Sequence, residues 1–101
     1  MVTEKRTLLT VITEAAIESV LLKDLESLGM LGYTIADVRG KGSRGVRDGQ
    51  RQESANIRIE TVLTTQKATA ILDYLAKHYY DHYAMIAFTR EVDILRPAKF
   101  S

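Results

Sequence analysis

Two halves of this chain repeat one hydrophobic pattern, and that repetition limits the folds open to it. Each half starts with a short run of β-branched and apolar residues, continues with apolar residues at helical spacing, and ends with a second extended run. This order predicts an α+β domain of the ferredoxin-like βαββαβ kind, a sandwich with an antiparallel sheet and both helices on one face. The predicted strands cover residues 6–13, 33–39, 55–64 and 84–95, and the predicted helices lie between them at about 14–28 and 65–79.

Local residues mark the ends of the two predicted helices. Thr13 and Thr65 carry hydroxyls that can cap a helix N-terminus, and Gly29 suits the left-handed residue that ends a helix. Pro97 stops the last strand. The helix residues predicted to face the core are Ile17, Val20, Leu21, Leu25 and Leu28 in the first helix, and Ala68, Ile71, Leu72, Leu75, Ala76 and Tyr79 in the second.

The predicted sheet has one face that its own helices do not cover. In the third strand, Ile57 and Ile59 alternate with polar residues and are expected to face inward. In the first strand, Leu9 and Val11, or the residues that alternate with them, are expected on the uncovered face. Because monomeric proteins rarely expose an apolar patch of that extent, we expect copies of the chain to associate through this face.

Composition excludes several kinds of protein. The 101 residues suffice for one domain, and the absence of cysteine excludes disulfides, thiolate chemistry and cysteine-ligated zinc. A net charge of +1 gives no overall attraction to nucleic acid or to an anionic membrane. No segment resembles a signal peptide or is long and apolar enough to span a bilayer. The sequence therefore predicts a cytoplasmic protein without membrane insertion.

One segment, residues 39–53, concentrates positive charge. It contains four of the six glycines and has a local charge of +3, whereas the rest of the chain sums to −2. Glycines let backbone N–H groups approach an anion, and arginine side chains bind phosphate through two parallel hydrogen bonds. A loop of this length in a compact domain is usually either functional or disordered. The segment therefore predicts an anion site between the second and third strands.

The residues that lead into this loop resemble those of a known family. The segment Gly32–Arg44 is similar to the segment before the T-loop of PII signalling proteins. Its Gly-Lys-Gly-Ser-Arg opening at residues 40–44, followed by Arg47, resembles the PII-like branch of SbtB-type regulators of bicarbonate uptake and carboxysome-associated PII proteins (CPII). The resemblance implies one domain over residues 1–101 with a flexible T-loop at about 40–54, assembled as a homotrimer. It also implies an adenine nucleotide in each cleft between subunits, built from the loop base of one chain and the last strand of its neighbour.

The resemblance also assigns individual residues to the nucleotide. Thr34 matches a threonine near the adenine, and Arg96 matches a phosphate-contacting arginine late in the last strand. The implied ligands are ADP or AMP, with ATP and cyclic AMP as further candidates, together with bicarbonate; no catalytic cofactor is implied. The residues expected to surround the phosphates are Gly40, Lys41, Gly42, Ser43, Arg44 and Arg47.

Departures from the classical PII pattern narrow the expected function. Residues 40–54 contain no tyrosine, so uridylylation there is not expected, and Arg44 stands where classical members have a glutamine that helps to hold 2-oxoglutarate. The segment Asp81–Met85 replaces the classical glycine-lysine segment before the last strand. The resemblance implies a signalling protein rather than an enzyme. It would sense ADP or AMP and regulate inorganic carbon uptake or carboxysome-linked metabolism, through a bicarbonate transporter or a carboxysome-associated protein.

Other interpretations of the same residues stay open. Charged, glycine-rich loops are also typical of solvated connections, and the five cations permit nucleic-acid binding, although no aromatic residue interrupts the loop. A small phosphohydrolase is a third alternative, although no nucleophile–base–orienter set is visible. His78 and His82 share a helical face, and with Asp81 they give a weak metal signal. Thr34 could be an ordinary strand residue, and Arg96 could pair with an acidic residue of the last strand.

Overall fold

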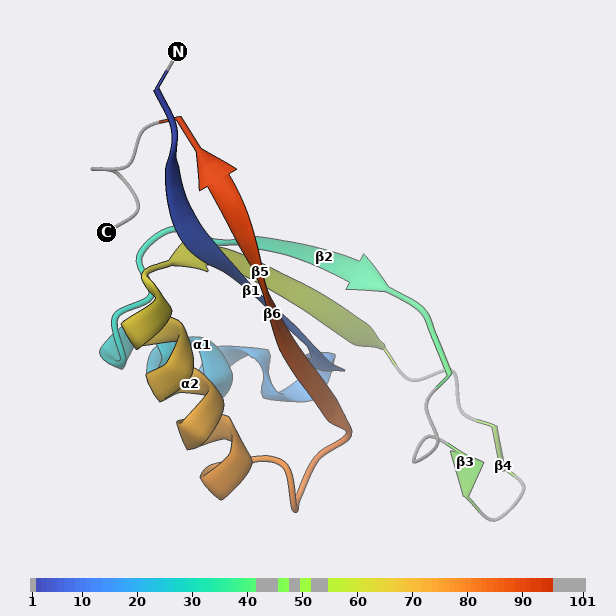
Figure 1. Ribbon diagram of the computed structural model, residues 1–101. Coiled ribbons are helices and arrows are strands. Elements are labelled where there is room, and N and C mark those ends of the chain that lie inside the picture. The colour runs from blue at the N-terminus through green and yellow to red at the C-terminus, as the bar shows by residue number, and fades with distance from the viewer. Residues whose placement is uncertain (1, 42–45, 48–49, 52–54, 96–101) are drawn as a thin grey trace.

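A computed structural model describes residues 2–41, 46–47, 50–51 and 55–95 of this chain (Figure 1). Four longer strands and two α-helices make the body of the described part, and two strands of two residues each lie in the basic segment. In chain order the elements are β1 (Glu4–Glu14), the 3₁₀ turn η1 (Ala15–Ile17), α1 (Glu18–Ser27), β2 (Thr34–Val38), β3 (Val46–Arg47), β4 (Gln50–Arg51), β5 (Asn56–Leu63), α2 (Thr65–His78) and β6 (Met85–Ile94).

The four longer strands form one antiparallel sheet in the order β2-β5-β1-β6. The central strand β1 pairs with β5 along one edge and with β6 along the other, and each half of the chain contributes one helix between its strands. Both helices lie against the same face of the sheet (Figure 1). The predicted ferredoxin-like α+β sandwich is confirmed.

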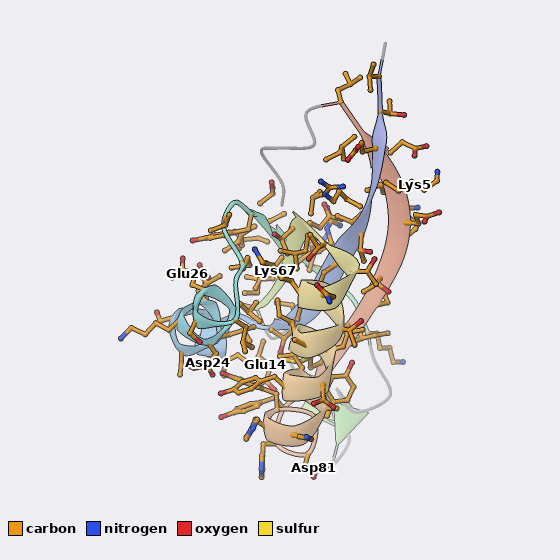
Figure 2. The ribbon with its side chains drawn as sticks, turned by 60° about the vertical axis from the view of Figure 1, so that its left-hand side comes forward. Lys5, Glu14, Asp24, Glu26, Lys67 and Asp81 are labelled. Atoms are coloured by element: carbon orange, nitrogen blue, oxygen red, sulfur yellow. The ribbon has the colours of Figure 1, made fainter. Side chains whose placement is uncertain are left out.

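Strands β1 and β6 continue beyond the rest of the sheet as a two-stranded ribbon. The first residues of β1 pair only with β6, since the pairing of β1 with β5 begins at Thr7. Figure 2 shows Lys5 on this ribbon, well away from both helices. The Lys5 Nζ donates to Asp93 Oδ1 at 2.9 Å, and this bond raises the pKa of Lys5 above its ordinary value. Because both side chains are exposed, we expect the pair to contribute little to stability.

Side chains between the sheet and the helices form one hydrophobic core. Ile57 and Ile59 are about 1% exposed, which confirms the faces predicted for β5. On β1, Leu9 and Val11 are fully buried in this core, so the uncovered face carries the residues that alternate with them. The buried apolar residues are Leu9, Val11, Ile17, Leu21, Leu25, Met30, Ile57, Ile59, Leu63, Ala68, Ile71, Leu75 and Tyr79.

Two residues that the helical spacing assigned to the core lie outside it. Val20 is 51% exposed, and Ala76 is also exposed. Leu21 and Leu25 are fully buried, so the residues facing the sheet follow the i, i+4 row that contains them. Val20 precedes that row by one residue, which turns it about a quarter of a turn toward solvent.

Both predicted helix caps are wrong, for different reasons. Thr13 donates its hydroxyl to the carbonyl of Ala84 instead, and α1 begins only at Glu18, after the 3₁₀ turn. The second helix is capped by Thr64 rather than Thr65, with the Thr64 side chain accepting from a main-chain N–H of the first turn. Adjacent threonines offer the same hydroxyl, so only the backbone path decides which one caps.

Gly29 ends α1 as predicted, and its backbone conformation explains why. Its φ is +111°, a value that residues with a side chain rarely adopt. The Gly29 N–H donates to the carbonyl of Glu26, and the Met30 N–H donates to the carbonyl of Leu25, both at 3.1 Å. These two bonds form a Schellman motif, which satisfies carbonyls that the helix leaves without partners.

We expect Gly29→Ala to lower the free energy of unfolding by about 1–2 kcal/mol. The new Cβ would occupy a positive-φ backbone and would lie 3.1 Å from Cδ and Cε of Lys67. Gly32→Ala is the matched control, because its Cβ would meet nothing within 4 Å and its φ is not positive. Urea unfolding followed by circular dichroism measures both. Equal losses in the two variants would contradict the strain assigned to Gly29.

A hydrogen bond joins the two helices at the end of α2. The Tyr79 hydroxyl donates to Asp24 Oδ2 at 2.5 Å, and Tyr79 is 5% exposed. The tyrosine rings of Tyr74 and Tyr83 lie on either side, with centroids 6.3 and 5.7 Å from that of Tyr79. The three tyrosine rings therefore cover this end of the helix layer. Burial, followed by the hydrogen bond to Asp24, raises the pKa of Tyr79 well above its ordinary value.

We expect Tyr79→Phe to lower the free energy of unfolding by about 1 kcal/mol at neutral pH, because one hydrogen bond is lost and the ring is kept. The folded chain holds the Tyr79 proton more tightly than the unfolded chain, so wild-type stability falls once the pH exceeds about 10, where unfolded tyrosine ionises. Phenylalanine has no ionisable hydroxyl, so the free energy of unfolding of the variant should fall less above that pH. Urea unfolding at pH 7 and between pH 9 and 11 tests both statements; parallel losses above pH 10 would contradict the second.

Candidate functional site

The basic segment emerges where β2 ends and β5 begins. Val38 and Asn56 are paired at this end of the sheet, so the chain between them starts and finishes at neighbouring positions. Gly40 and Lys41 follow β2 directly, and both are exposed. A Cβ added at Gly40 would meet no atom within 4 Å, so this backbone is open to an approaching ligand. Arg39, between β2 and Gly40, is also exposed, so the loop base presents two cations and open main chain to solvent.

Two short strands within the basic segment were not predicted. Strand β3 pairs antiparallel with β4, with Val46 opposite Arg51 and Arg47 opposite Gln50. Figure 1 shows this pair beyond the ends of β2 and β5, away from both helices. The segment is rich in glycine and charged residues, and neither kind of residue favours a strand, so the sequence did not indicate this strand pair.

Thr34 lies at the opposite end of β2 from the loop base. It is exposed and pairs with Glu60 of β5, so both side chains project from the sheet face that the helices leave uncovered. The four steps from Thr34 to Val38 span roughly 13 Å of extended strand. Within one chain, the residue expected near the adenine and the residues expected near the phosphates are therefore separated by the length of β2.

The remaining predicted residues are described only in part. The structure places Arg47 by its backbone, in β3. Gly42, Ser43, Arg44 and Arg96 lie outside the described residues. Their roles, and the role of the Arg47 side chain, stay predictions. Asp93, an acidic residue of the last strand, already pairs with Lys5.

Glu60 lies beside a predicted site residue, Thr34, and was not itself predicted as one. The alternation of β5 placed Glu60 and Arg58 outward, but only the pairing of β2 with β5 puts Glu60 beside Thr34. Arg58 Nε lies 3.8 Å from Glu60 Oε2, and both side chains are partly exposed. Glu60 thus offers a carboxylate acceptor to the same surface as Thr34.

An apolar patch lies on the same sheet face, across β5, β1 and the edge strand β6. Ile86 and Phe88 are 55% and 48% exposed, although both lie within strand β6. Their partners on β1 are Ile12 and Thr10, and Leu8 lies on the same face. We call this sheet face the open face, and its apolar residues are Leu8, Ile12, Val62, Ile86 and Phe88. Thr10 lies between the patch and the Thr34–Glu60 pair, because it is paired with Phe88 on one side and with Glu60 on the other.

His78 and His82 each lie beside a tyrosine ring. The His78 ring lies against Tyr74 with centroids 4.3 Å apart, and the His82 ring meets the edge of Tyr83. No group of three or more His, Cys, Asp or Glu side chains comes together among the residues that the structure describes.

Neither helix of the described fold is long and apolar enough to cross a membrane.

The described fold is a ferredoxin-like sandwich that carries a cationic segment between β2 and β5. Residues 6–99 match the family described as nitrogen regulatory protein P-II, so the chain belongs to this family. The predicted family resemblance is confirmed.

Solved structures support the same assignment. A PII-like signalling protein from Thermus thermophilus is 37% identical, with a TM-score of 0.84 over 100% of both chains. CPII from Thiomonas intermedia, in a structure bound to ADP and bicarbonate, is 25% identical, with a TM-score of 0.85 over 99% of this chain and 98% of that chain. A second CPII structure, bound to ADP, AMP and acetate, aligns at 24% identity with the same TM-score and coverage, and shows the common fold.

Proposed function

We propose that this protein is a regulator that binds ADP or AMP, with the nucleotide phosphates held by its basic loop. The observation that carries the proposal is the exposed, glycine-flanked base of a loop of local charge +3, at Gly40 and Lys41. Main-chain N–H groups and cationic side chains together favour a phosphate oxygen. The 25% identity to a CPII structure with bound ADP and bicarbonate supports an adenine nucleotide as the source of that phosphate. ATP and cyclic AMP are the further candidates.

The site we propose lies between copies of the chain. Thr34 and Glu60 share a surface at one end of β2, and the loop base lies at the other end. Two copies that meet over the open face would bring the Thr34–Glu60 pair of one beside the loop base of the next. The Glu60 carboxylate would then accept from a nucleotide donor, either the adenine amine or a ribose hydroxyl. The apolar area around Ile86 and Phe88 favours such an assembly, which we propose to be a homotrimer.

We propose that nucleotide binding is signalled by a change in loop conformation. Residues 40–54 would form this loop, a T-loop attached to a single domain. A ligand that binds one loop conformation better than others shifts the population toward it. Bicarbonate is a small, flat anion that could occupy the same cationic site beside a phosphate. We propose that the protein regulates inorganic carbon uptake or carboxysome-linked metabolism in the cytoplasm, with a bicarbonate transporter or carboxysome-associated protein as its partner.

Calorimetric titration tests the proposal directly. AMP, ADP, ATP and cyclic AMP are titrated into the full chain, each with and without bicarbonate, while light scattering measures the mass of the assembly. We expect at least one adenine nucleotide to bind with a micromolar dissociation constant, which corresponds to about −8 kcal/mol. Heats indistinguishable from dilution for all four nucleotides would refute the proposal, and a monomeric mass would refute the shared site.

A further inference from the structure

The last residues of β1 contact the β5 side of the loop base. Glu14 pairs with Asn56, the first residue of β5, and Asn56 pairs in turn with Val38, the last residue of β2. One step further, the Ala15 N–H donates to the carbonyl of Ala55 at 3.0 Å. The end of β1 is therefore hydrogen-bonded to the segment on which the basic loop closes.

The same end of β1 also holds the connection between α2 and β6. The Ala84 N–H donates to Glu14 Oε2 at 2.8 Å, and the Ala84 carbonyl accepts from Thr13 Oγ1 at 2.9 Å. The ladder between β1 and β6 ends one step earlier, at the pair of Thr13 with Met85. Both main-chain polar groups of Ala84 are thus bound by side chains of β1. Thr13 is 2% exposed, so its contact is well shielded from water.

The rest of this connection is firmly held, which leaves Ala84 as its point of attachment to the loop side of the molecule. The Tyr83 N–H donates to the carbonyl of Tyr79 at 3.1 Å, and Tyr79 is fixed to α1 through Asp24. The Ala87 N–H donates to the Tyr80 hydroxyl at 2.7 Å, which secures the start of β6. These bonds tie the connection to α1 and to the start of β6, and the bonds at Ala84 tie it to the end of β1.

We propose that Glu14 is a positioning residue that holds the α2–β6 connection in register with the base of the basic loop, and thereby sets the affinity for the phosphate end of the nucleotide. The inference rests on the proposed function. Glu14 joins the loop base to the α2–β6 connection, since its main chain pairs with β5 and its carboxylate accepts from the Ala84 N–H. A hydrogen bond from an N–H to a carboxylate is stronger than one between neutral groups, and its loss leaves the N–H without a partner.

The test compares three variants with the wild-type chain by calorimetric titration of ADP at 25 °C. We expect Glu14→Ala to weaken ADP binding on the order of tenfold, the loss typical of one hydrogen bond to a charged group. Glu14→Gln keeps an acceptor oxygen for the Ala84 N–H and should bind within about threefold of wild type. Glu26→Ala makes the same charge change on the exposed surface of α1 and should bind like wild type.

Amide hydrogen exchange at Ala84 separates positioning from a general loss of stability. ADP should slow this exchange in the wild-type chain and have no such effect in Glu14→Ala, with circular dichroism confirming that the variant is folded. Unchanged ADP affinity in Glu14→Ala would overturn the inference alone, even if its melting temperature falls. An equal loss in Glu14→Gln would also overturn it, because charge rather than the hydrogen bond would then be responsible. Absence of ADP binding to the wild-type chain would instead overturn the proposed function.

Discussion

Leu21→Ala is expected to lower the free energy of unfolding by about 2–5 kcal/mol. Leu21 is fully buried on the sheet-facing row of α1, so the substitution removes apolar contacts and leaves a cavity that the packed core fills only in part. A domain of this size has a total stability of about 5–15 kcal/mol, so the loss is a large fraction of it. Urea unfolding, followed by circular dichroism and tyrosine fluorescence, measures the change.

The neighbouring residue provides the control for this prediction. Val20→Ala removes apolar atoms from the same helix, but Val20 is 51% exposed and lies outside the core. We expect its effect to stay within about 0.5 kcal/mol, as for other surface substitutions. Leu21→Met, which roughly conserves volume, should cost less than about 1.5 kcal/mol. A loss for Val20→Ala as large as that for Leu21→Ala would contradict the assigned orientation of α1.

The second large effect concerns ligand affinity. Replacing both Lys41 and Arg47 by alanine should weaken ADP binding by about 100- to 10,000-fold, if each contributes one hydrogen bond of about 1.5–3 kcal/mol to phosphate. Lys41 is exposed at the loop base, and Arg47 lies in β3 of the same segment. Adenosine has no phosphate, so its affinity should change by less than about threefold. Calorimetric titration of the two ligands measures the difference.

A remote charge serves as the control for the loop variants. Lys23 is exposed on α1, and Lys23→Ala changes the net charge without touching the loop. Its ADP affinity should match that of the wild-type chain. If the double variant loses adenosine and ADP affinity by the same factor, the two cations do not act on the phosphates, and their assigned role is wrong.

Much of the fold was predictable because its signals are local. The alternation of Ile57 and Ile59 requires only neighbouring residues, and the structure buries both. Gly29 ended the first helix as predicted, since a φ of +111° strongly favours glycine. The first strand is different, because its consecutive apolar and β-branched residues carry no alternation. Whether Leu9 faces the helices is decided by the strands on either side, and no local pattern contains that information.

The candidate site was predictable only as far as it lies within one segment. Charge and glycine in residues 39–53 indicated an anion site, but Glu60 gains its place beside Thr34 through the pairing of β2 with β5. Residue 14 was predicted to begin the first helix. It is instead the last residue of β1, and its carboxylate binds Ala84, 70 positions away.

The amino-acid sequence by itself determined the order of strands and helices, the family resemblance and the cationic hairpin tip, because each depends on residues that are close together in the chain. Only the tertiary structure decided which face of β1 is buried, which threonine caps α2, and which side chains share a surface with Thr34. Those features depend on the register between strands. A shift of one residue in that register would turn every side chain of the strand to the opposite face. The free energy that fixes the register comes from contacts between distant segments of the chain.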